Sequence, residues 1–223
     1  MDTVNLIYDY FPELTEEQRE RFARLEGLYR EWNEKINVIS RKDMDEFWVH
    51  HVLHSLAIAE YLRRRYPAGI WDGATVLDVG TGGGFPGIPL AMEFPNTEFV
   101  LCDSIRKKIT VAEAVATGLG LDNVRCINAR AETLPDKFDW VVSRAVTSLA
   151  EFYPWVKDSF NHSILYLKGG DVNEEISELL RKFKLDPRHI GTWNINEWLK
   201  NDYFAEKFVI EIGKDYLCLS KSE

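Results

Sequence analysis

From residue 75 onward, short apolar runs alternate with longer amphipathic segments. The apolar runs predict β-strands at residues 75–80, 98–103, 124–129, 138–143 and 163–168. The segments between and after them predict helices near residues 86–94, 104–118, 147–160 and 173–184. Two adjacent apolar runs at residues 206–213 and 214–220 predict a closing antiparallel hairpin. Together these elements indicate an α/β fold with a mostly parallel, seven-stranded sheet.

The first part of the chain has a helical pattern instead. A capping box at residues 15–18 begins the first predicted helix, and apolar residues then recur at helical spacing. A second helix is predicted to begin near Asp43 or Asp45 and to end at Leu62. Proline and glycine residues mark the passage into the next unit. We therefore expect a helical extension at residues 1–70 and an α/β domain at residues 71–223.

The first predicted strand runs directly into a glycine-rich turn, Thr75-Val-Leu-Asp-Val-Gly-Thr-Gly-Gly-Gly-Phe-Pro-Gly87. The second predicted strand ends in Asp103, 25 positions after Asp78. A strand, a glycine turn, a helix and a second strand that ends in a carboxylate form a nucleoside-binding unit, in which the acid accepts both ribose hydroxyls. The alternative is that Asp103 only caps the helix that follows.

The spacing of the glycines separates two nucleoside cofactors. In a dinucleotide site the first glycine of G-x-G-x-x-G directly follows the strand, and counting from Gly80 puts Phe85 where the third glycine belongs. The alternative pattern, D-x-G-x-G-x-G, is typical of the S-adenosylmethionine (AdoMet) turn of class I methyltransferases. It is matched by Asp78, Gly80, Gly82 and Gly84. Both this motif and the closing hairpin predict AdoMet rather than NAD.

Composition narrows the class of protein further. The 223 residues are 45% hydrophobic and 28% charged, no apolar run approaches the roughly 20 residues of a membrane span, and no signal peptide is recognisable. The cysteines at positions 102, 126 and 218 have no metal-binding or disulfide spacing, so we expect a cytoplasmic protein with reduced thiols. The net charge of −9 argues against indiscriminate binding of nucleic acids but leaves room for a local basic patch.

Ligands of open α/β sheets bind beyond the carboxyl ends of the strands. After the third strand come Ala131 and Glu132, whose backbone is placed to bind adenine, unless they only begin a helix. After the fourth strand, Arg144 stands where amine methyltransferases carry Asn/Asp-Pro-Pro-aromatic, and no cysteine follows a proline. This favours an aromatic ring nitrogen such as guanine nitrogen-7 as the methyl acceptor, because no proton must leave first. Alignment would then supply most of the catalysis.

Further cations follow the second and fifth strands. Arg106, Lys107 and Lys108 fall in the first turn of a helix, where they oppose the helix dipole, so we weigh RNA phosphate contacts against a solvated face. Lys168 is a further candidate for RNA binding. His50, His51 and His54 lack a carboxylate or cysteine at matching spacing, so we expect no metal site.

The chain closely resembles the RsmG (GidB) family of bacterial methyltransferases, which modify guanine nitrogen-7 in 16S ribosomal RNA of the small subunit. The resemblance rests on Trp32-Asn33-x-x-Ile36-Asn37, His51-x-x-x-Ser55, the turn extended by Gly84-Phe-Pro-Gly-Ile-Pro89, Asp103-Ser104-x-x-Lys107, Arg130-Ala-Glu132 and Ser143-Arg-Ala145. It implies AdoMet contacts at Gly80, Phe85, Ala131, Glu132 and Arg144. One departure is His54, where the family often has Asp.

For Arg144 we predict a role in orienting the target, without a general base. Its donors could hold guanine oxygen-6 or a phosphate, whereas an arginine tied to Glu132 would only stabilise the cofactor pocket. Two other functions stay open on the sequence alone: methylation of a small molecule, and AdoMet binding by a non-catalytic assembly factor.

Overall fold

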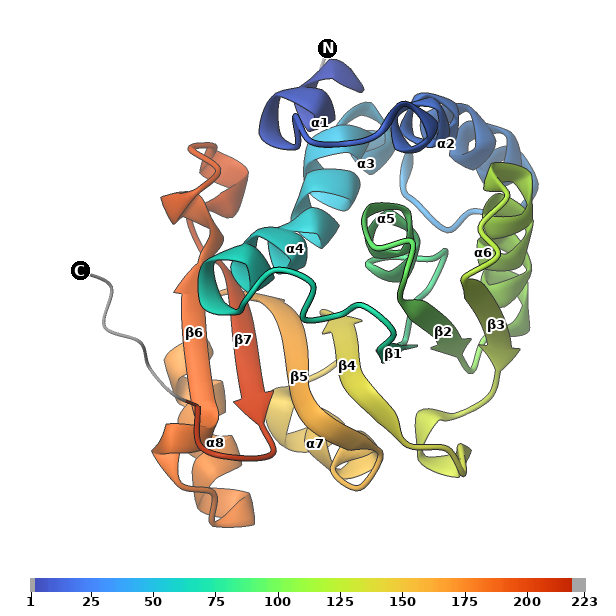
Figure 1. Cartoon of the computed structure of the whole chain (residues 1–223). Coiled ribbons are helices and arrows are strands. Elements are labelled where there is room, and N and C mark those ends of the chain that lie inside the picture. Colours follow the sequence, from blue (N-terminus) through green and yellow to red (C-terminus); the bar gives the residue numbers. More distant parts are fainter. Residues whose placement is uncertain (1–2, 218–223) are drawn as a thin grey trace.

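The computed structural model describes residues 3–217. At its centre is a seven-stranded sheet with the order β3-β2-β1-β4-β5-β7-β6 (Figure 1). Neighbouring strands from β3 to β5 pair in parallel, and β7 is antiparallel to both of its neighbours. The predicted, mostly parallel sheet is therefore confirmed. Its strands are β1 (Thr75–Val79), β2 (Glu98–Asp103), β3 (Val124–Asn128), β4 (Phe138–Arg144), β5 (Phe160–Gly169), β6 (Ile190–Asn194) and β7 (Lys207–Gly213).

The predicted hairpin is wrong in one of its two strands. Strand β7 pairs with β5 on one side and with β6, which precedes it in the chain, on the other, and not with the run at residues 214–220. Because β5 and β6 occupy the two edges of β7, the described part of that run, residues 214–217, forms no strand; residues 218–220, with Cys218, lie outside the described residues. The short β6, which contains Gly191, carries too little alternation to be recognised in the sequence.

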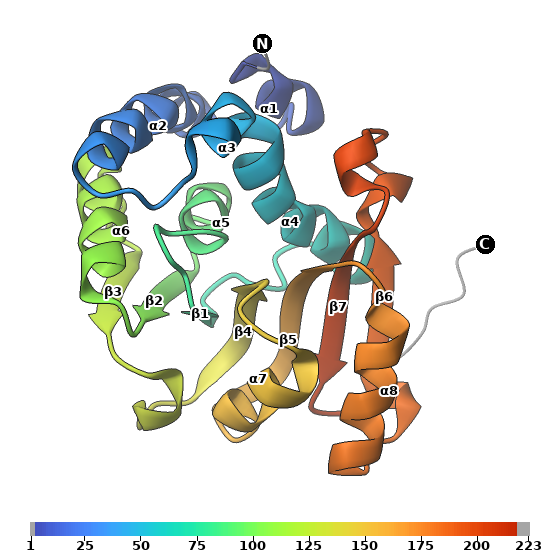
Figure 2. The ribbon, with the colours of Figure 1, turned by 180° about the vertical axis from the view of Figure 1, so that it is seen from behind.

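Helices cover both faces of the sheet (Figure 2). The helices α2, α4, α5 and α6 pack on one face, while α7 and α8 pack on the other. The short first helix was missed; it has only 6 residues and no side-chain cap. The helices are α1 (Asn5–Tyr10), α2 (Glu16–Lys35), α3 (Arg41–Asp45), α4 (His54–Arg65), α5 (Gly87–Glu93), α6 (Arg106–Leu119), α7 (Leu149–Val156) and α8 (Val172–Phe183).

The second helix predicted in the N-terminal part is not continuous. The short helix α3 is followed by η1 (Phe47–Leu53), a π-helix, and η1 continues directly into α4. Ser40 caps α3 by accepting a hydrogen bond from the backbone N–H of Asp43. A π-helix of this length is rare and often marks a functional site. Here it carries His50 and His51 toward the carboxyl ends of the strands.

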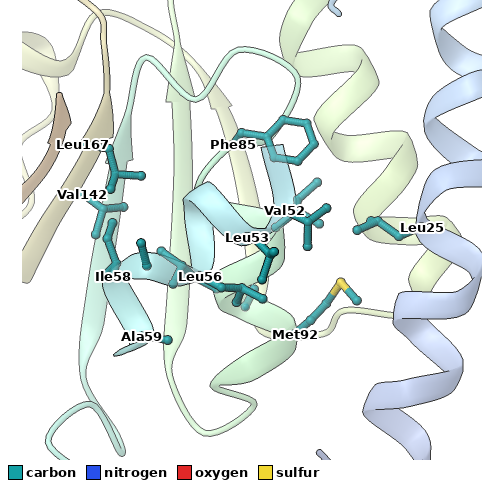
Figure 3. Close-up of a cluster of buried hydrophobic side chains, with 14 of the residues drawn as sticks. Leu25, Val52, Leu53, Leu56, Ile58, Ala59, Phe85, Met92, Val142 and Leu167 are labelled. Carbon is teal, nitrogen blue, oxygen red and sulfur yellow. The ribbon is translucent and has the colours of Figure 1, made fainter. Parts of the chain in front are cut away.

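The N-terminal helices share one hydrophobic core with the sheet. Figure 3 shows Leu25 of α2, Val52 of η1 and Leu56 of α4 within the same buried cluster as Val142 of β4. Polar contacts fix α2 against the sheet domain, since the Gln18 side chain donates to the carbonyl oxygens of Met92 (2.9 Å) and Glu93. The division of the chain at residue 70 stays a prediction.

A buried carboxylate joins α4 to strand β7 of the sheet. Glu211 of β7 is completely buried and accepts hydrogen bonds from the hydroxyls of Tyr61 (2.7 Å) and Tyr66. The Arg65 guanidinium lies 3.8 Å away. Because a buried carboxylate is costly without donors, these tyrosines hold the end of α4 against β7.

We expect Tyr61→Phe to lower the free energy of unfolding by about 1–3 kcal/mol, because it leaves one oxygen of a buried carboxylate without its donor. Urea denaturation followed by far-UV circular dichroism measures this change. Tyr153→Phe is the control, because the Tyr153 hydroxyl has no hydrogen bond to any residue between 3 and 217. Equal losses in the two variants would contradict the role given to Glu211.

Candidate active site

The buried side chain of Asp78 fixes the shape of the glycine turn. Its carboxylate is completely buried and accepts hydrogen bonds from the Thr81 hydroxyl (2.6 Å) and the backbone N–H of Gly87 (2.8 Å). Burial raises the pKa of Asp78 to about 7, although both hydrogen bonds act in the opposite direction. Asp78 thus joins the start of the turn to the start of α5, and its second oxygen has no partner among residues 3–217.

The glycine turn is also joined to the end of β2, through Gly82 and Asp103. Gly80 has φ +69°, and a Cβ atom there would collide with the Val146 side chain, so only glycine fits. The backbone N–H of Gly82 donates to Asp103 Oδ2 (3.0 Å), and that of Ile105 donates to Oδ1 (2.8 Å). A carboxylate has about four acceptor sites, so Asp103 keeps acceptor capacity beyond these two bonds.

A cavity of about 520 Å³, here named the strand-end cavity, opens beyond the carboxyl ends of the strands. Its size and mixed walls suit a nucleoside cofactor: a carboxylate and backbone groups alternate with apolar side chains. It is lined by Val79, Gly80, Cys102, Asp103, Ser104, Ile105, Lys108, Ala129, Arg130, Ala131, Glu132, Arg144, Ala145, Val146 and Trp155. Five of the predicted cofactor residues, Gly80, Asp103, Ala131, Glu132 and Arg144, are therefore brought together.

The remaining predicted cofactor residues do not line this cavity. Besides Asp78 and Gly82, these are Gly84 and Phe85. Phe85 is buried and stacks on Tyr29 of α2, with ring centroids 4.7 Å apart. Gly84 has φ +114°, and a Cβ atom there would lie 2.9 Å from the Tyr29 hydroxyl oxygen. The Tyr29 hydroxyl in turn donates to the carbonyl oxygen of Gly83 (2.8 Å), so α2 holds the turn from behind.

Arg144 ends β4 and reaches the π-helix η1. Its Nη1 donates to the carbonyl oxygen of His50 (3.1 Å), and its Nη2 lies 3.0 Å from His51 Nδ1. The guanidinium carbon is 5.2 Å from the centroid of the Phe85 ring. Arg144 forms no ion pair within residues 3–217, whereas Glu132 lies 3.8 Å from Arg130. The arrangement in which Glu132 holds Arg144 is therefore not found.

The hydrogen-bond pattern of η1 explains why the His50 carbonyl is available. The backbone N–H of His54 donates to the carbonyl oxygens of Val49 and His51. In an α-helix it would donate to that of His50, four residues earlier. The His50 carbonyl is instead taken by Arg144, with the Tyr203 hydroxyl at 3.4 Å.

His51 and His54 are held as neutral side chains beside this cation. Burial lowers the pKa of His51 to about 3, and the charge of Arg144 acts in the same direction. Burial likewise lowers the pKa of His54, whose Nδ1 lies 3.1 Å from the Tyr203 hydroxyl. A neutral His51 can accept a hydrogen bond from Arg144, whereas a protonated one would repel it.

A second, smaller cavity of about 210 Å³, here named the helix-side cavity, adjoins the strand-end cavity at Arg144. Arg144 and Ala145 line both cavities. The helix-side cavity is otherwise lined by Asp43, His50, His51, His54, Leu167, Lys168, Gly169, Tyr203 and Lys207. Asp43 and Tyr203 were not recognised in the sequence, because they lie about 160 positions apart and neither belongs to a strand end.

The predicted RNA-binding residues fall into two groups. Arg106 and Lys107 are exposed at the start of α6, and Lys108 beside them lines the strand-end cavity. Lys168 lines the helix-side cavity, but its ammonium group is already engaged: it lies 3.0 Å from Glu175 and donates to the carbonyl oxygen of Thr147 (2.8 Å).

Within residues 3–217, no three His, Cys, Asp or Glu side chains are grouped to hold a metal ion. No helix of that range is long and apolar enough to cross a bilayer.

Comparison with known proteins gives a consistent family. A family model described as rRNA small subunit methyltransferase G (GidB) matches residues 18–193. A protein of Flavobacterium psychrophilum named ribosomal RNA small subunit methyltransferase G is 47% identical over 214 residues, which cover 92% of this chain and 96% of that protein. The protein of the same name from Porphyromonas gingivalis is 50% identical over 180 residues, which cover 77% of this chain and 79% of that protein.

Solved structures show the same fold at low sequence identity. The magnesium protoporphyrin IX methyltransferase of Synechocystis PCC 6803, solved with bound SAM, has a TM-score of 0.61 and is 16% identical, with 96% of this chain and 98% of that one covered. A SAM-dependent methyltransferase from Aquifex aeolicus has a TM-score of 0.56 at 16% identity, with 78% and 98% covered. The class I methyltransferase fold predicted from the glycine turn is thereby confirmed.

The lowered pKa of His51 predicts a pH dependence of stability. Between pH 6.5, its ordinary pKa, and about 3, the unfolded chain takes up a proton that the native protein excludes. This contribution to stability is complete above pH 6.5 and is lost as the pH falls. We expect the unfolding free energy of His51→Asn to fall less between pH 7 and pH 5 than that of wild type, by about 1–2 kcal/mol.

Urea titrations at each pH, at constant ionic strength, measure the difference between the two proteins. The range above pH 7 is the control, because there the unfolding free energies of wild type and His51→Asn should change with pH in the same way. Curves that stay parallel down to pH 5 would show that His51 titrates normally in the native protein.

Proposed function

Because the chain belongs to the rRNA small subunit methyltransferase G family, we propose that it transfers a methyl group from AdoMet to nitrogen-7 of a guanine in 16S ribosomal RNA. The observation that carries this proposal is the meeting of two cavities at Arg144 and Ala145. The larger suits a nucleoside cofactor, and the smaller lies where a base would approach it. The substrate is the small ribosomal subunit or its precursor, so the protein acts in the cytoplasm.

The residues of the strand-end cavity fit AdoMet. Asp103 retains acceptor capacity for ribose hydroxyls, and the segment at Ala131 and Glu132 lines the same cavity and would bind the adenine edge. Ile105 and Trp155 supply apolar wall for the ring. Bound there, AdoMet supplies an activated methyl group on a sulfonium sulfur. Four further residues act indirectly, by fixing the shape of the turn: Asp78, Gly82, Gly84 and Phe85.

The proposed reaction needs no general base from the protein. Guanine nitrogen-7 has a free lone pair and loses no proton when it is methylated, so no side chain must act as a base. Arg144 is suited to a different task, because its fixed cation and planar donors can hold guanine oxygen-6, next to nitrogen-7 on the same base edge. Contact with nitrogen-7 itself would block the lone pair. Rate acceleration then comes from alignment.

Arg106 and Lys107 lie in the exposed first turn of α6, beside the strand-end cavity. Two cations in that position oppose the helix dipole, and an RNA phosphate nearby would offset this cost. Binding through such a local patch fits a protein with a net charge of −9.

Methylation of RNA by the purified protein is the direct test. Small-subunit RNA and intact small subunits from a strain without this protein should take up tritium from methyl-labelled AdoMet, and the label should map to nitrogen-7 of one guanine. The same RNA from the parent strain is the control, because its site is already methylated. Label in a small molecule only, or AdoMet binding without transfer to any acceptor, would refute the proposal.

Substitution of Arg144 separates target orientation from cofactor binding. We expect Arg144→Ala to lower methyl transfer about tenfold or more, equal to about 1.4 kcal/mol, with little change in AdoMet affinity. Arg144→Lys should rescue poorly, because lysine lacks the planar fork. Calorimetry measures the affinity and tritium transfer the rate. Asp103→Ala is the contrasting variant and should lose AdoMet affinity. If the AdoMet affinity of Arg144→Ala falls as much as its rate of methyl transfer, Arg144 belongs to the cofactor pocket instead.

A further inference from the structure

The helix-side cavity contains a carboxylate among cations. Asp43 of α3 contributes the carboxylate, and Arg144 and Lys207 contribute positive charges. Lys168 also lines the cavity, but its ammonium group is paired with Glu175. The volume of the cavity is about 210 Å³, less than half that of the strand-end cavity at about 520 Å³. A cavity of this size suits one planar base rather than a whole nucleoside. Its lining combines one carboxylate, several cations and ring nitrogens, so it offers both acceptors and donors to the edges of a base.

The carboxylate of Asp43 is held in place by two contacts, and it can accept further hydrogen bonds. Its Oδ2 accepts a hydrogen bond from the Ser40 hydroxyl (2.6 Å), and its Oδ1 lies 3.4 Å from His50 Nδ1. Its side chain is 45% exposed, so acceptor positions of both oxygens remain open. The Ser40 hydrogen bond and the nearby histidines lower the pKa of Asp43, so it is ionised at neutral pH.

We propose that the helix-side cavity binds the target guanine and that Asp43 selects it by accepting hydrogen bonds from N1–H and the 2-amino group. The inference rests on the proposed function. These two donors lie side by side on the Watson–Crick edge of guanine, and one ionised carboxylate can accept both. Adenine offers an unprotonated ring nitrogen at the first of these positions, which the carboxylate repels. Asp43 is thus the specificity-determining residue for the base.

The position of Arg144 completes the recognition. Guanine oxygen-6 lies between N1 and nitrogen-7 on the rim of the base. With Asp43 at the N1 side and Arg144 at oxygen-6, nitrogen-7 comes next in order. Because Arg144 lines both cavities, this order directs nitrogen-7 toward the strand-end cavity, where the methyl donor would lie.

The walls of the cavity suit a base taken out of its stack. The rings of His50 and Tyr203 are nearly parallel, with centroids 3.8 Å apart, and form an aromatic wall. Lys207 lies 5.1 Å from the centre of the Tyr203 ring and forms no ion pair in the described residues 3–217. Unstacked bases are bound against aromatic side chains, and their phosphates by cations. The cavity offers both.

Asp43 also has a structural role that the experiment must separate. It is the third residue after Ser40, the cap of α3, and its contact with Ser40 supports that cap. Loss of a cap would lower stability and would slow the methylation of every base alike. If Asp43 recognises the base, its substitution should slow the methylation of a base with a 2-amino group more than that of a base without one.

The test uses small-subunit RNA with either guanine or inosine at the mapped position, since inosine lacks only the 2-amino group. Wild type should prefer guanine by about tenfold or more in kcat/KM. Asp43→Ala should lose about tenfold or more on guanine and should methylate the two RNAs at similar rates, with unchanged AdoMet affinity. Asp43→Asn, which keeps an acceptor for Ser40, should also lose the preference. Asp45→Ala, an exposed acid on the same helix, is the charge-matched control and should keep it.

Equal losses on guanine and inosine in both Asp43 variants would overturn the inference and leave Asp43 as a helix cap. A wild-type preference that survives in either variant would overturn it as well. No methylation of either RNA by wild type would be a different failure, because it would refute the proposed function on which this inference rests.

Discussion

The site depends on the contact between a sheet and a helix that Arg144 makes. Its guanidinium ends β4, donates to the His50 carbonyl oxygen and lies over the Phe85 ring, so the strand end, η1 and the glycine turn are fixed relative to one another. Both cavities take one wall from this residue. A cation in this position is tolerated because backbone and ring acceptors replace the carboxylate that would otherwise neutralise it.

Burial and the charge of Arg144 together keep the neighbouring histidines His51 and His54 neutral. Within residues 3–217 no carboxylate forms an ion pair with the guanidinium, and its direct neighbours include His51. Burial keeps the pKa of His51 and His54 low, so neither adds a like charge. Tyr203, whose hydroxyl lies near both His50 and His54, links this group to the loop before β7. The charge of Arg144 therefore remains available to a ligand instead of being consumed within the protein.

The sequence predicted the parts of the molecule that depend on local pattern. The glycine turn, Asp103 and the five parallel strands were all recognisable, because glycine spacing and apolar runs are local features. The partner of β7 and the helix-side cavity were not. Strand β6 is short, and the cavity joins Asp43 to Tyr203 through the packing of α3, η1 and the segment before β7. Likewise, a π-helix differs from an α-helix only in its hydrogen-bond ladder, which residue types do not reveal.

The π-helix also makes the protein sensitive to residue count in one short segment. An α-helix advances about 100° per residue, so removal of one residue between Phe47 and Leu53 would rotate α3, together with Asp43, relative to α4. The carbonyl that receives Arg144 would return to the helix ladder at the same time. A substitution in this segment changes one side chain, whereas a deletion changes the register of the whole N-terminal unit. The geometry of this segment is therefore more sensitive to its length than to the identity of most of its side chains.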